Sequence, residues 1–273
     1  MLVSAEATDR EDEDDDSDEA HDAADDCHTD EQPLKFGVHS PQAITMDRPD
    51  RFPSAPGAAI FDFDETMIDL EAQHTFASEA LCREMGADFM EAPESLRLGS
   101  GSRVIDDVRD LRQFFGWTEP VEKLFAFRQK VFDDACRAAT LELLPGVERT
   151  VDALRTAGLL LAITSSADGT SIKAILRRFG LRDAFALIVD GSQVTRGKPD
   201  PEAYLLTAER LSVAPPSCIV FEDSHVGVAA AKAAGMYCVA IRNPRAQLRQ
   251  NLDAADVVLE NFEEFDVACI SDR

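Results

Sequence analysis

The sequence has few basic residues, no closely spaced cysteine pair and no long apolar run. Its 273 residues carry 27 Lys and Arg against 52 Asp and Glu, which gives a formal net charge of −25. Nucleic-acid backbones and anionic membranes both bind cationic protein surfaces, so the composition predicts neither as a partner. No uninterrupted apolar stretch reaches the length of a membrane-spanning helix, and no basic segment followed by an apolar one opens the chain. We therefore expect no membrane anchor and no signal peptide.

Cysteine usage indicates a reducing compartment. The six cysteines are scattered without a C-x-x-C pair, and two of them fall in apolar, strand-like runs, where buried thiols are common. This pattern favours free thiols in a cytoplasmic protein over a disulfide or a zinc site. The cysteines are Cys27, Cys82, Cys136, Cys218, Cys238 and Cys269.

Acidic residues are concentrated near the N-terminus. Residues 1–50 hold 17 Asp and Glu against three Lys and Arg, whereas the remaining residues hold 35 against 24. Such a charge density with few large apolar residues cannot bury enough surface to order the segment, so residues 1–56 are predicted to be a disordered acidic tail. The alternatives are an acidic interaction segment or an artefact of start-codon choice, with Met46 as the first residue.

From Ala58 onward, apolar runs of strand length alternate with amphipathic helical segments, several of which end at a glycine. This alternation predicts βαβ units and a parallel sheet covered by helices on both faces. The expected fold class is therefore α/β, with a Rossmann-like parallel sheet. The predicted strands are residues 58–63, 159–164, 185–190, 217–221, 237–241 and 255–260.

Residues 70–144 interrupt this alternation. They contain three segments with apolar residues at spacings of three to four and no convincing strand: "AQHTFASEALCREMG", "SRVIDDVRDLRQFFG" and "PVEKLFAFRQKVFDDACRAATLELL". We expect an inserted α-helical module directly after the first strand, and an α/β core formed by residues 57–69 together with 145–273.

Polar side chains follow the carboxyl ends of four elements of the predicted core. In parallel α/β sheets, ligands bind beyond these ends, where loops and helix N-termini meet. Each residue alone has an ordinary explanation, such as a helix N-cap for Asp223 or a solvated loop position for Lys198. The ordered combination of D-x-D-x-T, T-S, G-K-P-D and E-D-S instead favours one shared site. Its residues are Asp62, Asp64, Thr164, Ser165, Lys198, Glu222 and Asp223.

These four motifs, in this order between about Ala58 and Glu260, resemble the haloacid dehalogenase superfamily of phosphotransferases. The helical insertion after the first motif is similar to the α-helical cap of its β-phosphoglucomutase and phosphoglycolate phosphatase members. The resemblance implies that Asp62 is the nucleophile, which forms an aspartyl-phosphate, and that Asp64 is the general acid and base. Asp64 lies two residues from Asp62 along a strand, so both side chains can face the same side.

The resemblance also implies that Thr164 and Lys198 hold the transferring phosphoryl group. The hydroxyl and backbone N–H groups near Ser165, at the start of a predicted helix, suit phosphate oxygens as well.

A Mg²⁺ site is the last implication for the core. Asp223 and Glu222 would complete it with Asp62 and the backbone carbonyl of Asp64. The chemistry agrees, because Mg²⁺ prefers hard oxygen ligands, and because a carboxylate nucleophile is repelled by a phosphate unless cations neutralise both.

The helical insertion is expected to select the substrate by closing over the site. Candidate contacts are His74, in its first helix, and Arg103, in a glycine-containing turn, where a guanidinium can bind phosphate or carboxylate in a bidentate manner. Each could equally be a residue of a helix surface.

The sequence thus predicts a Mg²⁺-dependent phosphatase for a small phosphorylated metabolite, such as a sugar phosphate or a phosphoglycolate-like acid, in a monomer or weak homo-oligomer. The alternatives are a hexose-phosphate mutase with the same aspartyl-phosphate and a non-catalytic binding protein that kept the fold. Thr66 favours the phosphatase, since mutase members often carry Val there.

Glu65 departs from the family pattern. Members usually have Gly at this position, in the turn after the paired aspartates, where a residue without a side chain takes positive φ at little cost. A glutamate implies either an ordinary φ or a strained turn. We expect Glu65 to point outward, toward solvent or toward the hinge of the cap, and not to bind the metal.

Overall fold

The computed structural model describes residues 52–97, 101–243 and 250–271. The tail predicted for residues 1–56 therefore lies, up to residue 51, outside the described residues. The α-helices are α1 (Glu71–Glu84), α2 (Glu94–Arg97), α3 (Val104–Phe115), α4 (Val121–Ala138), α5 (Val147–Thr156), α6 (Gly169–Arg178), α7 (Glu202–Leu211), α8 (His225–Ala233) and α9 (Ala268–Ser271). Short 3₁₀ helices are η1 (Phe89–Glu91), η2 (Arg182–Ala184), η3 (Gly191–Gln193), η4 (Pro215–Ser217) and η6 (Phe262–Glu264).

Six parallel strands form one sheet, in the order β3-β2-β1-β4-β5-β6. The first strand in the sequence thus occupies the middle of the sheet, and the two halves of the chain add strands on either side of it. The predicted α/β fold with a Rossmann-like parallel sheet is confirmed. The strands are β1 (Ala58–Phe61), β2 (Leu160–Thr164), β3 (Leu187–Val189), β4 (Cys218–Glu222), β5 (Tyr237–Ile241) and β6 (Val257–Leu259).

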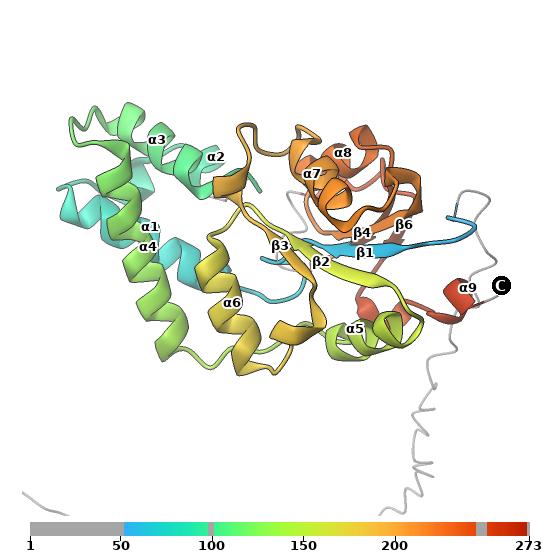
Figure 1. Cartoon of the computed structure of the whole chain (residues 1–273). Helices are drawn as coiled ribbons and strands as arrows, with labels where there is room; N and C mark the ends of the chain where they lie inside the picture. The colour runs from blue at the N-terminus through green and yellow to red at the C-terminus, as the bar shows by residue number, and fades with distance from the viewer. Residues whose placement is uncertain (1–51, 98–100, 244–249, 272–273) are drawn as a thin grey trace, which may run out of the picture. The chain divides into compact units, whose positions relative to one another are not determined.

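Helices cover both faces of the sheet, with α7 and α8 on one face and α5 and α6 on the other (Figure 1). The central strands β1, β4 and β5 are buried along their whole length, which explains why they read as continuous apolar runs instead of an alternating pattern. Alternate residues of β1 face opposite layers: Ile60 packs under α7 and α8, and Phe61 packs in the other layer.

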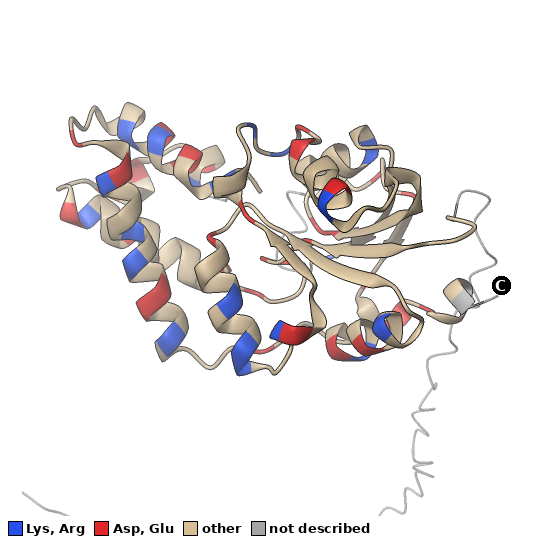
Figure 2. Cartoon of the chain, in the orientation of Figure 1, with Lys and Arg blue, Asp and Glu red and all other residues tan. Residues whose placement is uncertain are grey.

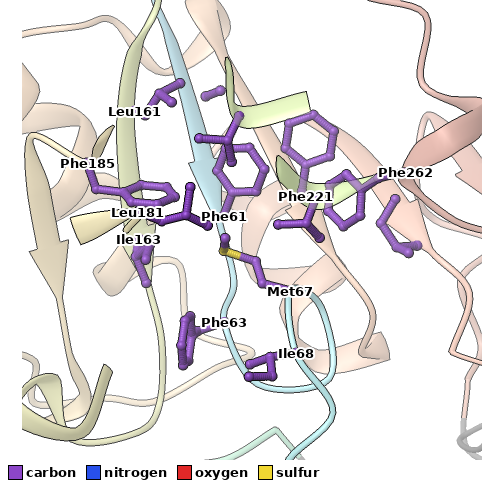
Figure 3. Packing of buried hydrophobic residues seen from close by; sticks show 14 of the residues in the cluster. Phe61, Phe63, Met67, Ile68, Leu161, Ile163, Leu181, Phe185, Phe221 and Phe262 are labelled. Atoms are coloured by element: carbon purple, nitrogen blue, oxygen red, sulfur yellow. The ribbon is translucent and has the colours of Figure 1, made fainter. Parts of the chain in front are cut away.

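Phenylalanines form the centre of the larger core layer (Figure 3). The ring of Phe61 stacks on Phe221 at 4.7 Å and lies 6.0 Å from Phe262, which comes from η6 near the C-terminus. Phe63 is also fully buried, so both phenylalanines that flank Asp62 pack in the core, as expected from the sequence. The buried rings of Phe61 and Phe63 therefore hold the backbone that carries Asp62 and Asp64.

The segment 70–144 is helical wherever it is regular. Its three predicted helices are α1, α3 and α4, of which α4 ends at Ala138, because Ala139 takes an extended conformation. Helix α4 packs against both α1 and α3. The three helices share a small core of their own that includes Leu81, Val108 and Leu124.

The two chain segments that connect these helices to the sheet pair with each other, through an antiparallel bridge between Ile68 and Leu143. Farther along, Asp133 of α4 accepts a hydrogen bond from the hydroxyl of Ser171 in α6 at 2.6 Å. Arg178 of α6 donates to the carbonyls of Cys136 and Ala139 at the end of α4. Helix α4 is thus fixed to α6 at its C-terminal half.

Basic and acidic residues lie along several of the helices (Figure 2), and some of them pair within one turn, as in Lys130 with Asp134. Within the part of the chain that the structure describes, no helix is both long and apolar enough to cross a membrane.

We predict that Phe262→Ala lowers the free energy of unfolding by about 3–5 kcal/mol, because it leaves a cavity beside Phe61 and Phe221. Urea denaturation of the purified protein measures this change. Val258→Ala, on the exposed side of β6, is the matched control and should cost less than about 1 kcal/mol. An equal loss in both variants would mean that η6 does not belong to the core.

Candidate active site

The carboxyl end of β1 places Asp62 between two neighbouring strands. Phe61 is in register with Ile163 of β2 and Phe221 of β4, and the backbone N–H of Asp62 donates to the carbonyl of Phe221. The next residue of each neighbouring strand, Thr164 or Glu222, therefore lies level with Asp62. The parallel register thus gathers the predicted motifs at one edge of the sheet.

Lys198 joins two of these carboxylates. It follows η3 in the loop before α7, and its ammonium group contacts both Asp62 Oδ1 and Glu222 Oε1. All three side chains are buried. Burial alone would lower the pKa of Lys198, but the two carboxylates outweigh burial and hold that pKa above its ordinary value. Lys198 is therefore a permanently charged centre of the cluster.

Glu222 has both carboxylate oxygens occupied by donors. Tyr204 Oη donates to Oε1 at 2.6 Å, and the backbone N–H groups of Asp223 and Ser224 donate to Oε2. The space for this carboxylate depends on Gly227 in the first turn of α8, where a Cβ would lie 1.9 Å from Oε1. Lys198, Tyr204 and the backbone at the start of α8 thus hold the carboxylate of Glu222 in place.

Asp223 is linked to Asp62 by the hydroxyl of Thr66, which lies 3.0 Å from Asp223 Oδ1 and 3.1 Å from Asp62 Oδ2. Burial raises the pKa of Asp62 to about 7, with Lys198 opposing the rise and Glu222 adding to it. Burial, followed by the charges of Glu222 and Asp62, raises the pKa of Asp223 well above its ordinary value. These two carboxyl groups need more positive charge than Lys198 supplies.

The same group of residues fits a divalent cation. Asp62, Glu222 and Asp223 each offer an oxygen, and these oxygens lie within 4.8 Å of one another. Three carboxylates around one ammonium leave two negative charges in excess, and hard oxygen donors are what Mg²⁺ prefers. The donors around Glu222 are already numerous, so Asp62 and Asp223 are the more open pair.

The predicted phosphate-binding hydroxyls take different directions. Thr164 is fully buried, and its hydroxyl lies 2.6 Å from that of Thr207 in α7, beneath the sheet edge. Ser165, one residue later, lines the cavity described below, and its hydroxyl accepts from the backbone N–H of Ala167. The structure therefore brings Ser165, and not the hydroxyl of Thr164, to the open side of the cluster.

Asp64 points toward the helical segment. Its Oδ2 lies 3.5 Å from His74 Nε2 of α1, whereas its buried Oδ1 has no hydrogen-bond partner among the described residues. Arg128 of α4 holds the histidine ring, since its Nη2 lies 3.1 Å from His74 Nδ1 and its Nε donates to Ser78. Burial lowers the pKa of Arg128 to about 10.

Arg103 does not reach this group. It is the N-cap residue of α3, and its guanidinium donates to Asp106 and, from Nη1, to the carbonyl of Val194 at 2.9 Å. Nearby, the hydroxyl of Ser166 donates to the carbonyl of Gly101. Arg103 therefore joins α3 to the loop that carries Lys198, and it does not line the cavity.

A cavity of about 190 Å³ lies in front of the cluster. Five predicted site residues line it: Asp62, Asp64, His74, Ser165 and Asp223. Thr164, Lys198, Glu222 and Arg103 are not part of its lining. Further polar residues of the described chain that line it are Glu65, Glu71, Thr75, Ser78, Arg97, Ser102, Asp107, Arg128, Ser166, Ser224, His225 and Gln250.

Glu65 has φ 63, in the left-handed region. Its Oε1 accepts from the backbone N–H of Leu70 at 2.9 Å, and its Oε2 accepts from Asn243 Nδ2 at 2.7 Å. Burial raises its pKa to about 7, although the bond from Leu70 lowers it. The side chain was expected to point toward solvent or toward the hinge of the helical segment, and it points toward the start of α1. The backbone was expected to have either an ordinary φ or a strained turn, and the positive φ makes it the strained turn.

Three contributors to the site were missed by the sequence analysis. Tyr204 is one of two tyrosines in the chain and lies on the buried face of α7. Arg128 occupies the buried stripe Leu124, Arg128, Phe132 of α4, so a lone charged residue at an apolar spacing was its available signal. Asn243 had none, because its partner Glu65 lies 178 residues earlier.

The fold is a parallel α/β sheet with paired aspartates after its central strand and a buried lysine that two acids share. This combination defines a class of enzymes, and that class matches a known family. A family model of haloacid dehalogenase-like hydrolases matches residues 56–235, from β1 to beyond α8. The chain belongs to this family of hydrolases, and the predictions of the family and of an enzyme are confirmed.

Similar proteins agree with that assignment. Hexitol phosphatase B of Escherichia coli is 33% identical over 218 residues, which cover 76% of this chain and 93% of the relative. Beta-phosphoglucomutase of Bacillus subtilis is 29% identical over 218 residues, 76% of this chain and 94% of the relative. The structure of CbbY from Rhodobacter sphaeroides in complex with phosphate has a TM-score of 0.70 at 24% identity and covers 79% of this chain and 99% of its own, which shows the same fold.

We predict that Glu65→Gly leaves the affinity for Mg²⁺ within about twofold of wild type, because both oxygens of Glu65 bind protein donors outside the metal cluster. Isothermal titration with Mg²⁺ measures the affinity. Asp223→Asn serves as the positive control and should weaken binding by far more. A loss in Glu65→Gly as large as in Asp223→Asn would place the third carboxylate in the metal site.

Proposed function

We propose that the protein is a Mg²⁺-dependent phosphatase that hydrolyses a small phosphorylated metabolite through an aspartyl-phosphate on Asp62. The observation that carries this proposal is the buried contact of Lys198 with Asp62 at the back of a cavity that Asp64 also lines. A nucleophilic carboxylate beside a fixed cation, with a second carboxyl group in reach of the leaving oxygen, is the arrangement that phosphate-ester hydrolysis through a covalent intermediate requires.

In the first step an oxygen of Asp62 forms a bond to phosphorus, and the ester P–O bond breaks. Asp64 protonates the leaving oxygen, and its Oδ1 is suited to this role because no group of the described chain occupies it. In the second step Asp64 takes the proton from a water molecule that attacks phosphorus, and Asp62 is released with inorganic phosphate. Lys198 and Ser165 hold the phosphoryl oxygens in both steps.

Asp62, Asp223 and the backbone carbonyl of Asp64 are the groups that we propose for Mg²⁺, with Glu222 beside them. A bound Mg²⁺ would neutralise charge on the phosphoryl group and on the two carboxylates. Glu222 serves mainly as the partner of Lys198, because it keeps the ammonium group directed along the sheet edge toward Asp62.

Residues 70–144 are proposed to be the cap, and residues 57–69 with 145–273 the core. Helix α1 of the cap supplies His74, which orients Asp64. Arg103 acts on the substrate indirectly in this arrangement, because it tethers α3 to the loop of Lys198 through Val194.

The charge of the cavity lining favours a substrate with a single phosphoryl group. Of the residues that the structure describes, six acids line it, namely Asp62, Asp64, Glu65, Glu71, Asp107 and Asp223, and two cations do, Arg97 and Arg128. A polyhydroxylated, otherwise uncharged remainder suits such a lining better than a second phosphate. We therefore favour a sugar or alditol monophosphate over a phosphoglycolate-like acid.

A hexose-phosphate mutase is the second candidate, since one relative is named beta-phosphoglucomutase. The two functions separate in one assay with β-glucose 1-phosphate and Mg²⁺. Release of inorganic phosphate supports the phosphatase, and formation of glucose 6-phosphate supports the mutase.

We predict that Asp62→Asn lowers phosphate release from a panel of sugar and alditol monophosphates by at least about a thousandfold, because the amide cannot form the covalent intermediate. Phosphate is quantified with Mg²⁺ present, and EDTA on the wild type provides the control for metal dependence. Turnover that survives in Asp62→Asn at the wild-type level would contradict the proposed nucleophile.

Asp64→Asn tests the acid separately. We predict a fall of about a hundredfold in the single-turnover release of phenol from phenyl phosphate, but less than about tenfold for p-nitrophenol from p-nitrophenyl phosphate. The difference arises because nitrophenolate departs without a proton. Equal losses on both esters would count against the acid role of Asp64.

A further inference from the structure

Glu65 takes a backbone conformation that normally favours glycine. Its φ of 63 and that of Ser212, 57, are the positive values among the described residues other than glycine. A side chain at such a position costs free energy relative to an ordinary φ. Glycine would remove that cost, so the side chain of Glu65 must provide an interaction that glycine cannot.

That interaction joins three separate segments. The carboxylate accepts one hydrogen bond from the backbone N–H of Leu70, the N-cap position of α1, and one from the side chain of Asn243, after β5. Glu65 itself lies in the turn that follows β1. The turn, the first connection to the helical segment and the loop after β5 are therefore tied at one carboxylate.

The same chain of hydrogen bonds continues to the metal cluster. The backbone N–H of Asn243 donates to Gln250 Oε1 at 3.2 Å, and Gln250 Nε2 donates to the carbonyl of Asp223 at 2.8 Å. Leu70 and Asp223 lie at opposite ends of this path. Displacement of the connection at Leu70 would thus be felt on both sides of the cavity.

Asp64 directly precedes Glu65, and its backbone contacts the same connection to α1. It forms a backbone bridge with Ile68, and the N–H of Glu65 donates to the carbonyl of Ile68 at 2.8 Å. Among the described residues no hydrogen bond fixes Oδ1 of Asp64, and its other oxygen lies 3.5 Å from His74 on α1. The orientation of the Asp64 side chain therefore depends on the position of the chain segment between Glu65 and Leu70.

We propose that Glu65 is a positioning residue, whose carboxylate fixes the connection to α1 and thereby aims Asp64 at the leaving oxygen. This role rests on the proposed function, because it assumes that Asp64 donates a proton. Glu65 itself touches neither the metal nor the phosphoryl group, since both of its oxygens bind protein donors.

Glu65→Gly tests the proposal with the backbone conformation preserved. We expect the single-turnover release of phenol from phenyl phosphate to fall by about tenfold or more, since small misplacements of a catalytic group are costly. Release of p-nitrophenol from p-nitrophenyl phosphate should fall less than about threefold, because nitrophenolate leaves without a proton from the acid. KM for both esters should stay within about twofold, because binding of the ester does not depend on the acid either.

Ser212→Gly is the matched control, because it relieves the same kind of backbone strain at the C-terminal end of α7. It should leave the kinetics of both esters unchanged. Circular dichroism verifies that each variant is folded before the rates are compared.

Exchange of the carboxylate and the amide between positions 65 and 243 provides a test by rescue of the rate. Asn243→Asp places two carboxylates against each other, so this single variant should lose the selective rate on phenyl phosphate, whereas in Glu65→Gln the amide of Asn243 can turn and accept from the new amide group. In the double variant the amide of residue 65 can accept from Leu70 and donate to residue 243. We expect the double variant to recover to within about threefold of wild type, a coupling that independent sites do not produce.

Glu65→Gly with the leaving-group dependence of wild type would overturn the proposal, and so would a double variant no better than Asn243→Asp. Equal losses on both esters would likewise assign Glu65 a merely structural role. Failure of the proposed function looks different: wild type itself would release neither phenol nor p-nitrophenol in the presence of Mg²⁺, and the positioning role would fall with it.

Discussion

The buried ammonium group of Lys198 is the interaction on which the rest of the site depends. A charge removed from water is tolerated only with close partners of opposite sign, and Lys198 has two, Asp62 and Glu222. These come from the ends of β1 and β4, while the lysine comes from the loop after β3. The three groups meet only if the strands are parallel and in register, so folding of the sheet and assembly of the site are one event. Removal of Lys198 would leave two buried carboxylates without their shared cation.

The three carboxylates of the cluster are stabilised unequally, and this inequality gives them different uses. Glu222 accepts from the lysine, from a tyrosine hydroxyl and from the backbone at the start of α8, so its carboxylate is fixed in position. Asp62 has the lysine and the hydroxyl of Thr66, and Asp223 has that hydroxyl alone among the side-chain donors of the described residues. Burial raises the pKa of both Asp62 and Asp223, and neighbouring carboxylates add to the rise. The side of the cluster that faces the cavity is therefore the side that is short of a cation, where both a metal ion and a phosphoryl-bearing substrate would approach.

Sequence patterns predicted the sheet, its helices and the edge at which the motifs gather, because apolar periodicity and chain order determine all three. They did not predict which of two adjacent hydroxyls faces the cavity. Thr164 still belongs to β2 and follows the pleat toward α7, where Thr207 binds it, whereas Ser165 has left the strand. That distinction depends on where the strand ends, a boundary that composition alone places only to within a few residues. Tyr204 and Asn243 were missed for a different reason, since their partners lie far away in the sequence and no local pattern connects them.

The helical segment is attached to the core unequally at its two ends, which bears on how a substrate reaches the cavity. Behind, α4 is fixed to α6 by Ser171 and Arg178, and the two connections pair through Ile68 and Leu143. In front, near the cavity, the attachments among the described residues include Arg103 to the carbonyl of Val194, Ser166 to that of Gly101 and His74 beside Asp64. These contacts are polar, whereas α4 and α6 share a buried apolar cluster, so their separation would expose part of the core. The contacts in front of the cavity therefore cost less to break than those between α4 and α6, and the hydrogen bond between Glu65 and Leu70 lies close to the bridge at Ile68.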